Sequence, residues 1–184
     1  MVEMRFHGRG GQGTVIASKI LADAVSQEGK HVQAYPQFGV ERRGAPVYAF
    51  IRIDSDPIFI RSTIQSPDHL IILDPTLIDT MDVSEGLKQG GIILINTGKT
   101  PQDFKELAAR FRVYTIDATE IALKHKLGSK AAPIVNTAIL GAVPRIFDFV
   151  SLDSIIASIK AGVPTNPEDN AAAAREAYDS VKGE

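Results

Sequence analysis

His7-Gly8-Arg9-Gly10-Gly11-Gln12-Gly13 lies near the start of the chain, between a short apolar stretch and a helical pattern. Residues 3–7 carry apolar side chains at alternate positions, which predicts a buried strand that ends at the glycines. Over residues 14–27 the apolar side chains recur at helical spacing. A second strand at 31–35, stopped by Pro36, would complete a β–loop–α–β unit. This arrangement predicts an α/β fold.

The pattern of strands and helices continues beyond this unit. Two apolar, β-branched runs, 69–73 and 91–95, are typical of central parallel strands that are covered on both faces. Residues 47–53 and 57–60, around a turn, predict an antiparallel hairpin inserted in the sheet. The other predicted elements are a short helix within 76–88, a helix at 102–110, a strand at 113–116, and helices at 119–126, 136–149 (kinked or broken at Pro144), 151–160 and 167–181. We therefore expect a single Rossmann-like domain over residues 1–184, with a mostly parallel, partly mixed sheet, helices on both faces and a helical C-terminal region.

The overall composition excludes several classes of function. Lysine and arginine total 20 against 22 acids, so no general charge favours nucleic acid or an anionic membrane as partner. The absence of cysteine excludes disulfides, thiol nucleophiles, thiolate zinc sites and ordinary iron–sulfur ligation within this chain. No apolar run approaches the roughly 18–20 residues of a membrane span, and the early glycines leave no room for a signal peptide. We expect a cytoplasmic protein with no catalytic residue or metal site of its own.

The glycine-rich loop is the first candidate binding site. Gly8, Gly10 and Gly13 satisfy the pattern G-x-G-x-x-G between a strand and a helix, where backbone N–H groups can face a phosphate. A tight turn that needs only small residues would fit equally well. No acid in 31–37 can hold a ribose, and Thr14 stands where a P-loop requires lysine. The candidate binding residues of this loop are Gly8, Arg9, Gly10, Gly11, Gln12 and Gly13.

A second candidate site is the charged loop Gln37-Phe38-Gly39-Val40-Glu41-Arg42-Arg43-Gly44-Ala45-Pro46. Such a cluster of charges is equally compatible with an ion-paired surface loop. Arginine, however, suits bidentate recognition of carboxylate or phosphate, and one carboxylate here is placed to orient a guanidinium. The candidate binding residues of this loop are Glu41, Arg42, Arg43 and Gly44. Asp74 follows a predicted strand directly, where capping the next turn is a commoner role than ligand binding.

A third motif, Asn136-Thr137-Ala138-Ile139-Leu140-Gly141-Ala142, completes a resemblance to a known family. With the two loops it resembles the gamma subunit of pyruvate and related 2-oxoacid:ferredoxin oxidoreductases. The likeness covers most of the chain, although Ala45 follows Gly44 where many members have paired glycines. Asn136 joins the candidate binding residues on this resemblance, with helix capping as the alternative.

The resemblance implies a non-autonomous subunit of a hetero-oligomeric complex. Such a complex oxidatively decarboxylates a 2-oxoacid such as pyruvate to acyl-CoA and CO2, and passes the electrons to ferredoxin. By the same resemblance, thiamine diphosphate, Mg and iron–sulfur clusters belong to companion subunits. Coenzyme A is expected at or near this chain, which would border the coenzyme A/substrate cleft and be inactive alone.

Two other functions remain open at this point. The first is a stand-alone nucleotide-binding protein of Rossmann type, which the missing ribose-binding acid and the missing P-loop lysine disfavour. The second is a regulatory binding module, which the two further motifs disfavour. Which 2-oxoacid the complex would use is left open.

Overall fold

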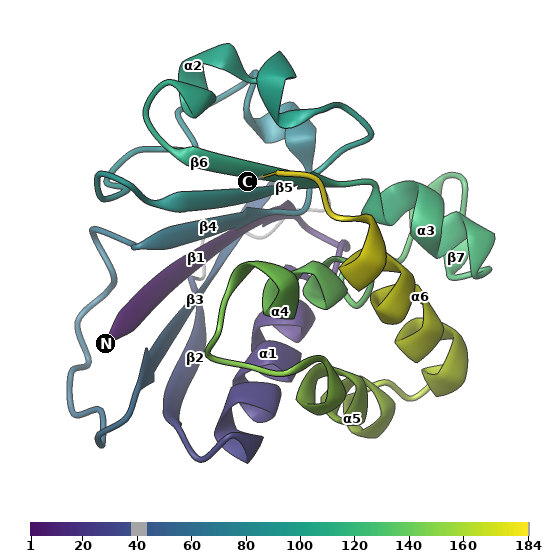
Figure 1. The fold of residues 1–184 in the computed structure, drawn as a ribbon, viewed down its shortest axis with the longest axis horizontal. Helices are drawn as coiled ribbons and strands as arrows, with labels where there is room; N and C mark the ends of the chain where they lie inside the picture. Colours follow the sequence, from purple (N-terminus) through teal and green to yellow (C-terminus); the bar gives the residue numbers. More distant parts are fainter. Residues whose placement is uncertain (38–43, 184) are drawn as a thin grey trace.

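The computed structural model describes residues 1–37 and 44–183. At its centre lies a six-stranded sheet in the order β2-β3-β1-β4-β5-β6 (Figure 1). Five strands run in the same direction, and β3 alone among the described strands of this sheet runs antiparallel to its neighbours β1 and β2. The strands are β1 (Val2–Arg9), β2 (His31–Gln37), β3 (Pro46–Asp54), β4 (His69–Ile72), β5 (Ile92–Asn96) and β6 (Arg112–Ile116). The expected mostly parallel, partly mixed sheet is confirmed.

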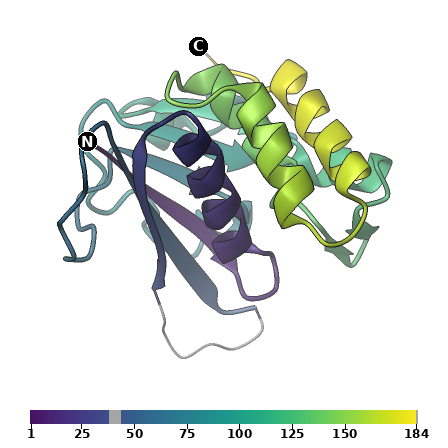
Figure 2. The same ribbon diagram turned by 90° about the horizontal axis from the view of Figure 1, so that it is seen from below.

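Helices cover both faces of the sheet, but unequally (Figures 1 and 2). The larger core lies under α1 (Thr14–Gln27), α3 (Ala118–Lys124), α4 (Val143–Ile146), α5 (Leu152–Gly162) and α6 (Pro167–Ser180). Within the described residues, the opposite face carries α2 (Lys105–Ala108), the turns after β4 and the 3-10 helices η1 (Pro75–Leu77) and η2 (Pro101–Asp103). A 3-10 helix, η3 (Ile139–Ala142), leads into α4, and β7 (Gly128–Ser129) and β8 (Ala132–Pro133) form a small hairpin.

The central strands are apolar throughout because they contribute to both cores. In β4, Ile71 packs into the larger core while Leu70 and Ile72 pack into the smaller one. In β5, Leu94 packs into the larger core and Ile95 into the smaller one. Alternate side chains of a strand point to opposite faces, so a strand covered on both faces must be apolar at every position.

The predicted hairpin at 47–53 and 57–60 is wrong in its second strand. Residues 57–60 belong to no strand, although β3 forms over nearly the expected range. Both edges of β3 are already occupied, by β1 on one side and β2 on the other, so a hairpin partner has no place there. Pro36 also fails to stop β2, which continues to Gln37, because an edge strand tolerates a residue without an N–H donor.

Two predicted helices are largely replaced by shorter structures. Residues 76–88 hold only the end of η1 followed by turns, among them Gly86 with a positive φ of 75°. Residues 136–149 contain η3 and α4 in place of one long helix, and Asn136 caps neither. Pro144 lies in the first turn of α4, where its missing N–H costs no helical hydrogen bond. It therefore starts a new short helix.

Candidate functional site

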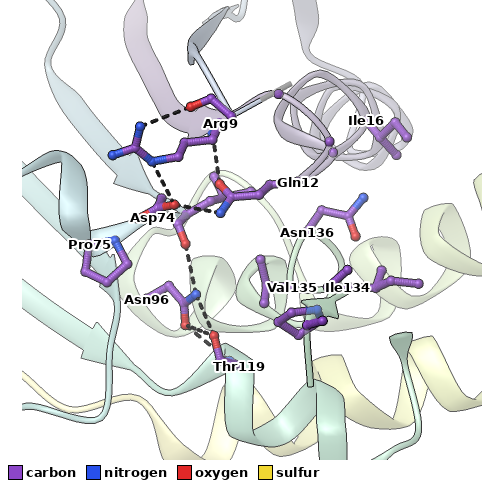
Figure 3. A pocket seen from close by; sticks show the side chains of 18 residues that line it. Arg9, Gln12, Ile16, Asp74, Pro75, Asn96, Thr119, Ile134, Val135 and Asn136 are labelled. Carbon is purple, nitrogen blue, oxygen red and sulfur yellow. Dashed lines mark hydrogen bonds and ion pairs between the residues drawn. The ribbon is translucent and has the colours of Figure 1, made fainter. Parts of the chain in front are cut away.

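A cleft of about 680 Å³ opens at the carboxyl ends of the parallel strands (Figure 3). Its walls come from the glycine-rich loop, the ends of β4 and β5, the start of α3 and residues 131–136. The chain leaves β1 through α1 towards β2 on one side, whereas β4 lies on the other side of β1. This reversal of strand order is where open α/β sheets commonly bind their ligands.

The glycine-rich loop places the N-terminus of α1 against this cleft. Gly11 and Gly13 have positive φ values of 95° and 76°, and Gly13 is the N-cap residue of α1. The Gln12 N–H donates to the Arg9 carbonyl at 3.0 Å, which closes the loop. The first N–H groups of a helix have no intrahelical acceptor and carry a partial positive charge. The loop therefore offers backbone donors to an anion in the cleft.

The end of the charged loop is tied to the glycine-rich loop by backbone hydrogen bonds. The Gly10 N–H donates to the Ala45 carbonyl at 2.9 Å, and the Gly44 N–H donates to the Gly10 carbonyl at 3.3 Å. Gly44 itself lines the cleft. The end of the charged loop that the structure describes, Gly44 and Ala45, is thus anchored beside the cleft.

Arg9 is held by an ion pair and does not stand free in the cleft. Its Nε lies 3.2 Å from Asp74 Oδ2, and its two terminal nitrogens donate to the Gly44 carbonyl at 3.0 Å and to Thr76 Oγ1 at 2.9 Å. Gln12 donates to the same Asp74 oxygen at 2.8 Å and accepts from the Arg9 N–H at 2.8 Å (Figure 3). This network fixes the shape of the loop, and Asp74 neutralises the Arg9 charge within the chain.

Asp74 is charged within this network. Partial burial acts to raise the pKa of its carboxyl, but hydrogen bonds from Thr76 and Gln12 and the Arg9 charge outweigh it, so the pKa lies below its ordinary value. Asp74 also caps η1, because its side chain accepts from the Thr76 N–H at 3.0 Å.

The floor of the cleft is fixed by a buried amide. Asn96 Nδ2 donates to the Leu73 carbonyl at 2.9 Å and to Thr119 Oγ1 at 3.0 Å, and Asn96 Oδ1 accepts from the Thr119 N–H at 3.2 Å. These bonds join the ends of β4, β5 and α3. Asn96 therefore acts as a structural joint between the three elements.

Asn136 packs directly against the glycine-rich loop. A Cβ built at Gly13 would collide with Asn136 Nδ2, so this position requires glycine both for its φ and for its space. Asn136 Oδ1 accepts from the Thr137 N–H at 3.0 Å. Gly8 allows a different close contact, with the start of α1, because a Cβ at this position would collide with the Thr14 hydroxyl.

The mouth of the cleft is apolar. Ile16 on α1 is 51% exposed and Ile134 beyond β8 is 42% exposed, and both line the cleft. Pro133 and Val135 continue this wall. The cleft thus combines backbone donors at one end with an exposed apolar surface, which suits a ligand that has both a phosphate and an apolar arm.

Comparisons with known proteins agree with this architecture. A family model described as pyruvate ferredoxin/flavodoxin oxidoreductase matches residues 3–180. This chain belongs to that family. It is 51% identical to the pyruvate/ketoisovalerate oxidoreductases common subunit gamma of Thermococcus kodakarensis, over 98% of this chain and 97% of the relative. It is also 49% identical to the pyruvate synthase subunit PorC of Methanothermobacter marburgensis, over 99% of this chain and 98% of the relative.

A solved structure of the same oxidoreductase family has the same fold. The pyruvate oxidoreductase subunit PORC of Thermotoga maritima gives a TM-score of 0.83 at 35% identity, over 99% of this chain and 97% of that chain. The resemblance to gamma-type subunits is therefore confirmed, and the chain is one subunit of a multi-subunit oxidoreductase. Neither a stand-alone nucleotide-binding enzyme nor an independent regulatory module is needed to account for it.

Within this family member, the structure gathers most of the predicted site residues around one cleft. Those that line it are Arg9, Gly10, Gly11, Gln12, Gly13, Gly44 and Asn136. Gly8 lies behind the loop, and Glu41, Arg42 and Arg43 lie outside the described residues. The sequence interpretation missed Asn96, Thr119, Ile16 and Ile134, and it treated Asp74 mainly as a cap. Asp74 and Asn96 were detectable as polar residues at the ends of consecutive parallel strands.

Within residues 1–37 and 44–183, no three His, Asp or Glu side chains gather into a metal-binding group. No helix in the same part of the chain is long and apolar enough to cross a bilayer.

Proposed function

We propose that this gamma-type subunit forms one wall of the coenzyme A site in a 2-oxoacid:ferredoxin oxidoreductase. In this proposal the complex oxidatively decarboxylates pyruvate or a related 2-oxoacid in the cytoplasm, and residues 1–184 act as one domain. Thiamine diphosphate, Mg and iron–sulfur clusters reside in companion subunits, which pass electrons to ferredoxin. The chain contributes binding and orientation of the acyl acceptor.

One observation carries the proposal: the N-terminus of α1 opens into a cleft with an apolar mouth. Coenzyme A combines phosphates with an apolar arm, and the N–H groups after Gly13 suit a phosphate. Ile16 and Ile134 provide apolar surface beside them. Because Arg9 is paired with Asp74, free cationic groups must come from elsewhere, and we assign that role to Arg42 and Arg43.

The test uses the assembled complex with Arg42→Ala or Arg43→Ala. Loss of one charge-assisted hydrogen bond should weaken coenzyme A binding by about 1–3 kcal/mol while the KM for the oxoacid stays unchanged. Gly11→Ala adds a methyl group where nothing in the described chain lies within 4 Å, but its φ of 95° also strains the loop, so a KM raised for coenzyme A and unchanged for the oxoacid would support a ligand site at this loop.

Size-exclusion chromatography of each variant separates binding from assembly. Variant complexes that remain intact with unchanged dependence on coenzyme A would refute the proposal. The isolated chain should also bind no oxoacid-derived intermediate and reduce no ferredoxin dye. Turnover by the purified chain alone would contradict this division of labour.

A further inference from the structure

The segment after β3 exposes apolar side chains at the end of the sheet opposite the cleft. Phe59 is 86% exposed and Ile60 is 44% exposed, the former more than any other large apolar side chain of the described chain. β3 runs antiparallel to β1, so Pro46 pairs with Arg9 beside the cleft and Ile53 pairs with Val2 at the far end. The connection from β3 to β4 projects there, beside the N-terminus (Figure 1).

This segment is held firmly to the sheet by side chains. Gln33 Nε2 donates to the Ile58 carbonyl at 2.9 Å, and Arg52 Nη2 donates to the Ser62 carbonyl at 2.6 Å. Arg52 Nη1 also lies 3.5 Å from the Ile60 carbonyl. Arg52 is itself buried and paired with Glu3 at 2.8 Å. Phe59 is therefore presented on an anchored backbone.

The anchoring contacts repeat at every second residue. The carbonyls held by this chain belong to residues 58, 60 and 62. A period of two is typical of extended backbone, in which the N–H and C=O groups of alternate residues point to opposite sides. On this pattern we expect the backbone groups of Phe59 and Arg61 to lie on the side away from the sheet. The segment has the apolar, β-branched and aromatic composition of a strand, yet no described strand pairs with it.

We infer that residues 57–61 are a docking segment for a companion subunit of the oxidoreductase: Phe59 enters an apolar pocket of the partner, and the outward backbone groups of Phe59 and Arg61 pair with a partner strand. A companion subunit is the fitting occupant because this chain is one component of a multi-subunit enzyme. An exposed aromatic side chain on a hydrogen-bonded backbone segment is typical of an interface anchor. Strand addition to a free edge supplies the backbone hydrogen bonds. The inference rests on subunit membership and is independent of the coenzyme A proposal, since the two surfaces lie at opposite ends of β1.

The first test measures association with the co-expressed companion subunits. The double variant Phe59→Ser, Ile60→Ser should weaken association by about tenfold or more, as expected for loss of an interface anchor. Phe59→Leu should retain assembly because it keeps an apolar side chain. Phe59→Leu is therefore the matched control for the double variant. Unchanged melting temperatures will show that each chain is folded.

The second test is hydrogen exchange of the isolated chain and of the complex. The amides of Phe59 and Arg61 should exchange more slowly in the complex. Wild-type association of the double variant, an effect no larger than that of Phe59→Leu, or unchanged exchange at these amides would each overturn the inference. A homodimer of the isolated chain that the double variant abolishes would also overturn it, because the occupant would then be a second copy.

Discussion

Gly13→Ala should destabilise the fold through two separable effects. The residue has a φ of 76°, and a non-glycine residue in the left-handed region costs about 1–2 kcal/mol. The new methyl group would also collide with Asn136 Nδ2 and lie 2.9 Å from Asn136 Cγ. Overpacking of this kind adds about 1–3 kcal/mol. The free energy of unfolding should therefore fall by about 2–5 kcal/mol in total.

Gly11→Ala provides the matched control. Gly11 has a φ of 95°, but a Cβ there meets nothing within 4 Å. It should lose only the backbone contribution of about 1–2 kcal/mol. Equilibrium unfolding in urea, with linear extrapolation to water, measures both variants.

Asn136→Ala isolates the steric contribution in a double-mutant cycle. The single variant loses the hydrogen bond from the Thr137 N–H, and the cycle subtracts that loss. In the Asn136→Ala background, about 1–2 kcal/mol of the Gly13→Ala cost should disappear, because the amide group that the new methyl group meets is gone. The relief is only partial because Cβ of residue 136 remains. Equal costs for Gly13→Ala and Gly11→Ala, or a coupling energy of zero, would show that the close approach of loop and Asn136 contributes nothing.

Two further predictions concern buried charged or titratable groups. Burial, with the Arg5 charge beside it, lowers the pKa of His7 from its ordinary value of 6.5 to about 3. Between pH 6.5 and pH 3 His7 is therefore protonated in the unfolded chain but neutral in the folded chain. Stability should fall by about 1.4 kcal/mol per pH unit as the pH drops from 6 towards 4, and His7→Gln should remove this slope; parallel slopes in urea titrations would contradict the assignment. Arg52→Ala should cost about 3–5 kcal/mol of unfolding free energy, because Glu3 loses its buried partner and the segment after β3 loses its anchor. A loss below about 1 kcal/mol by the same method would show that Glu3 is satisfied by solvent.

Local patterns in the sequence were sufficient for the elements that depend on local interactions. The helix after the glycine-rich loop begins and ends as predicted, because its apolar spacing and the glycines at either end act within a few residues. The apolar runs of β4 and β5 predicted central strands for a similar reason, since burial on both faces leaves no polar position. Of the residues that the motifs singled out, Gly10, Gly11, Gly13, Gly44 and Asn136 do meet at one cleft.

The failures have long-range causes. Residues 57–60 have the composition of a strand, but whether a strand forms depends on a free neighbouring edge, and β1 and β2 occupy both edges of β3. The ion pair between Arg9 and Asp74 could not be predicted from the sequence either, because it joins residues that are far apart along the chain. In the folded protein Asp74 neutralises the Arg9 charge.

The amino-acid sequence by itself determined the class of fold, the glycine-rich loop and the family, because these follow from periodicity, turn chemistry and motif order. Only the tertiary structure decided which polar groups are already satisfied and which surfaces stay open. The side-chain amide of Asn96 is hydrogen-bonded between the ends of β4 and β5 and the start of α3, whereas Ile16 and Phe59 remain exposed at opposite ends of the molecule. Hydrogen-bond partners and solvent exposure are set by packing between distant segments, and no local pattern encodes them.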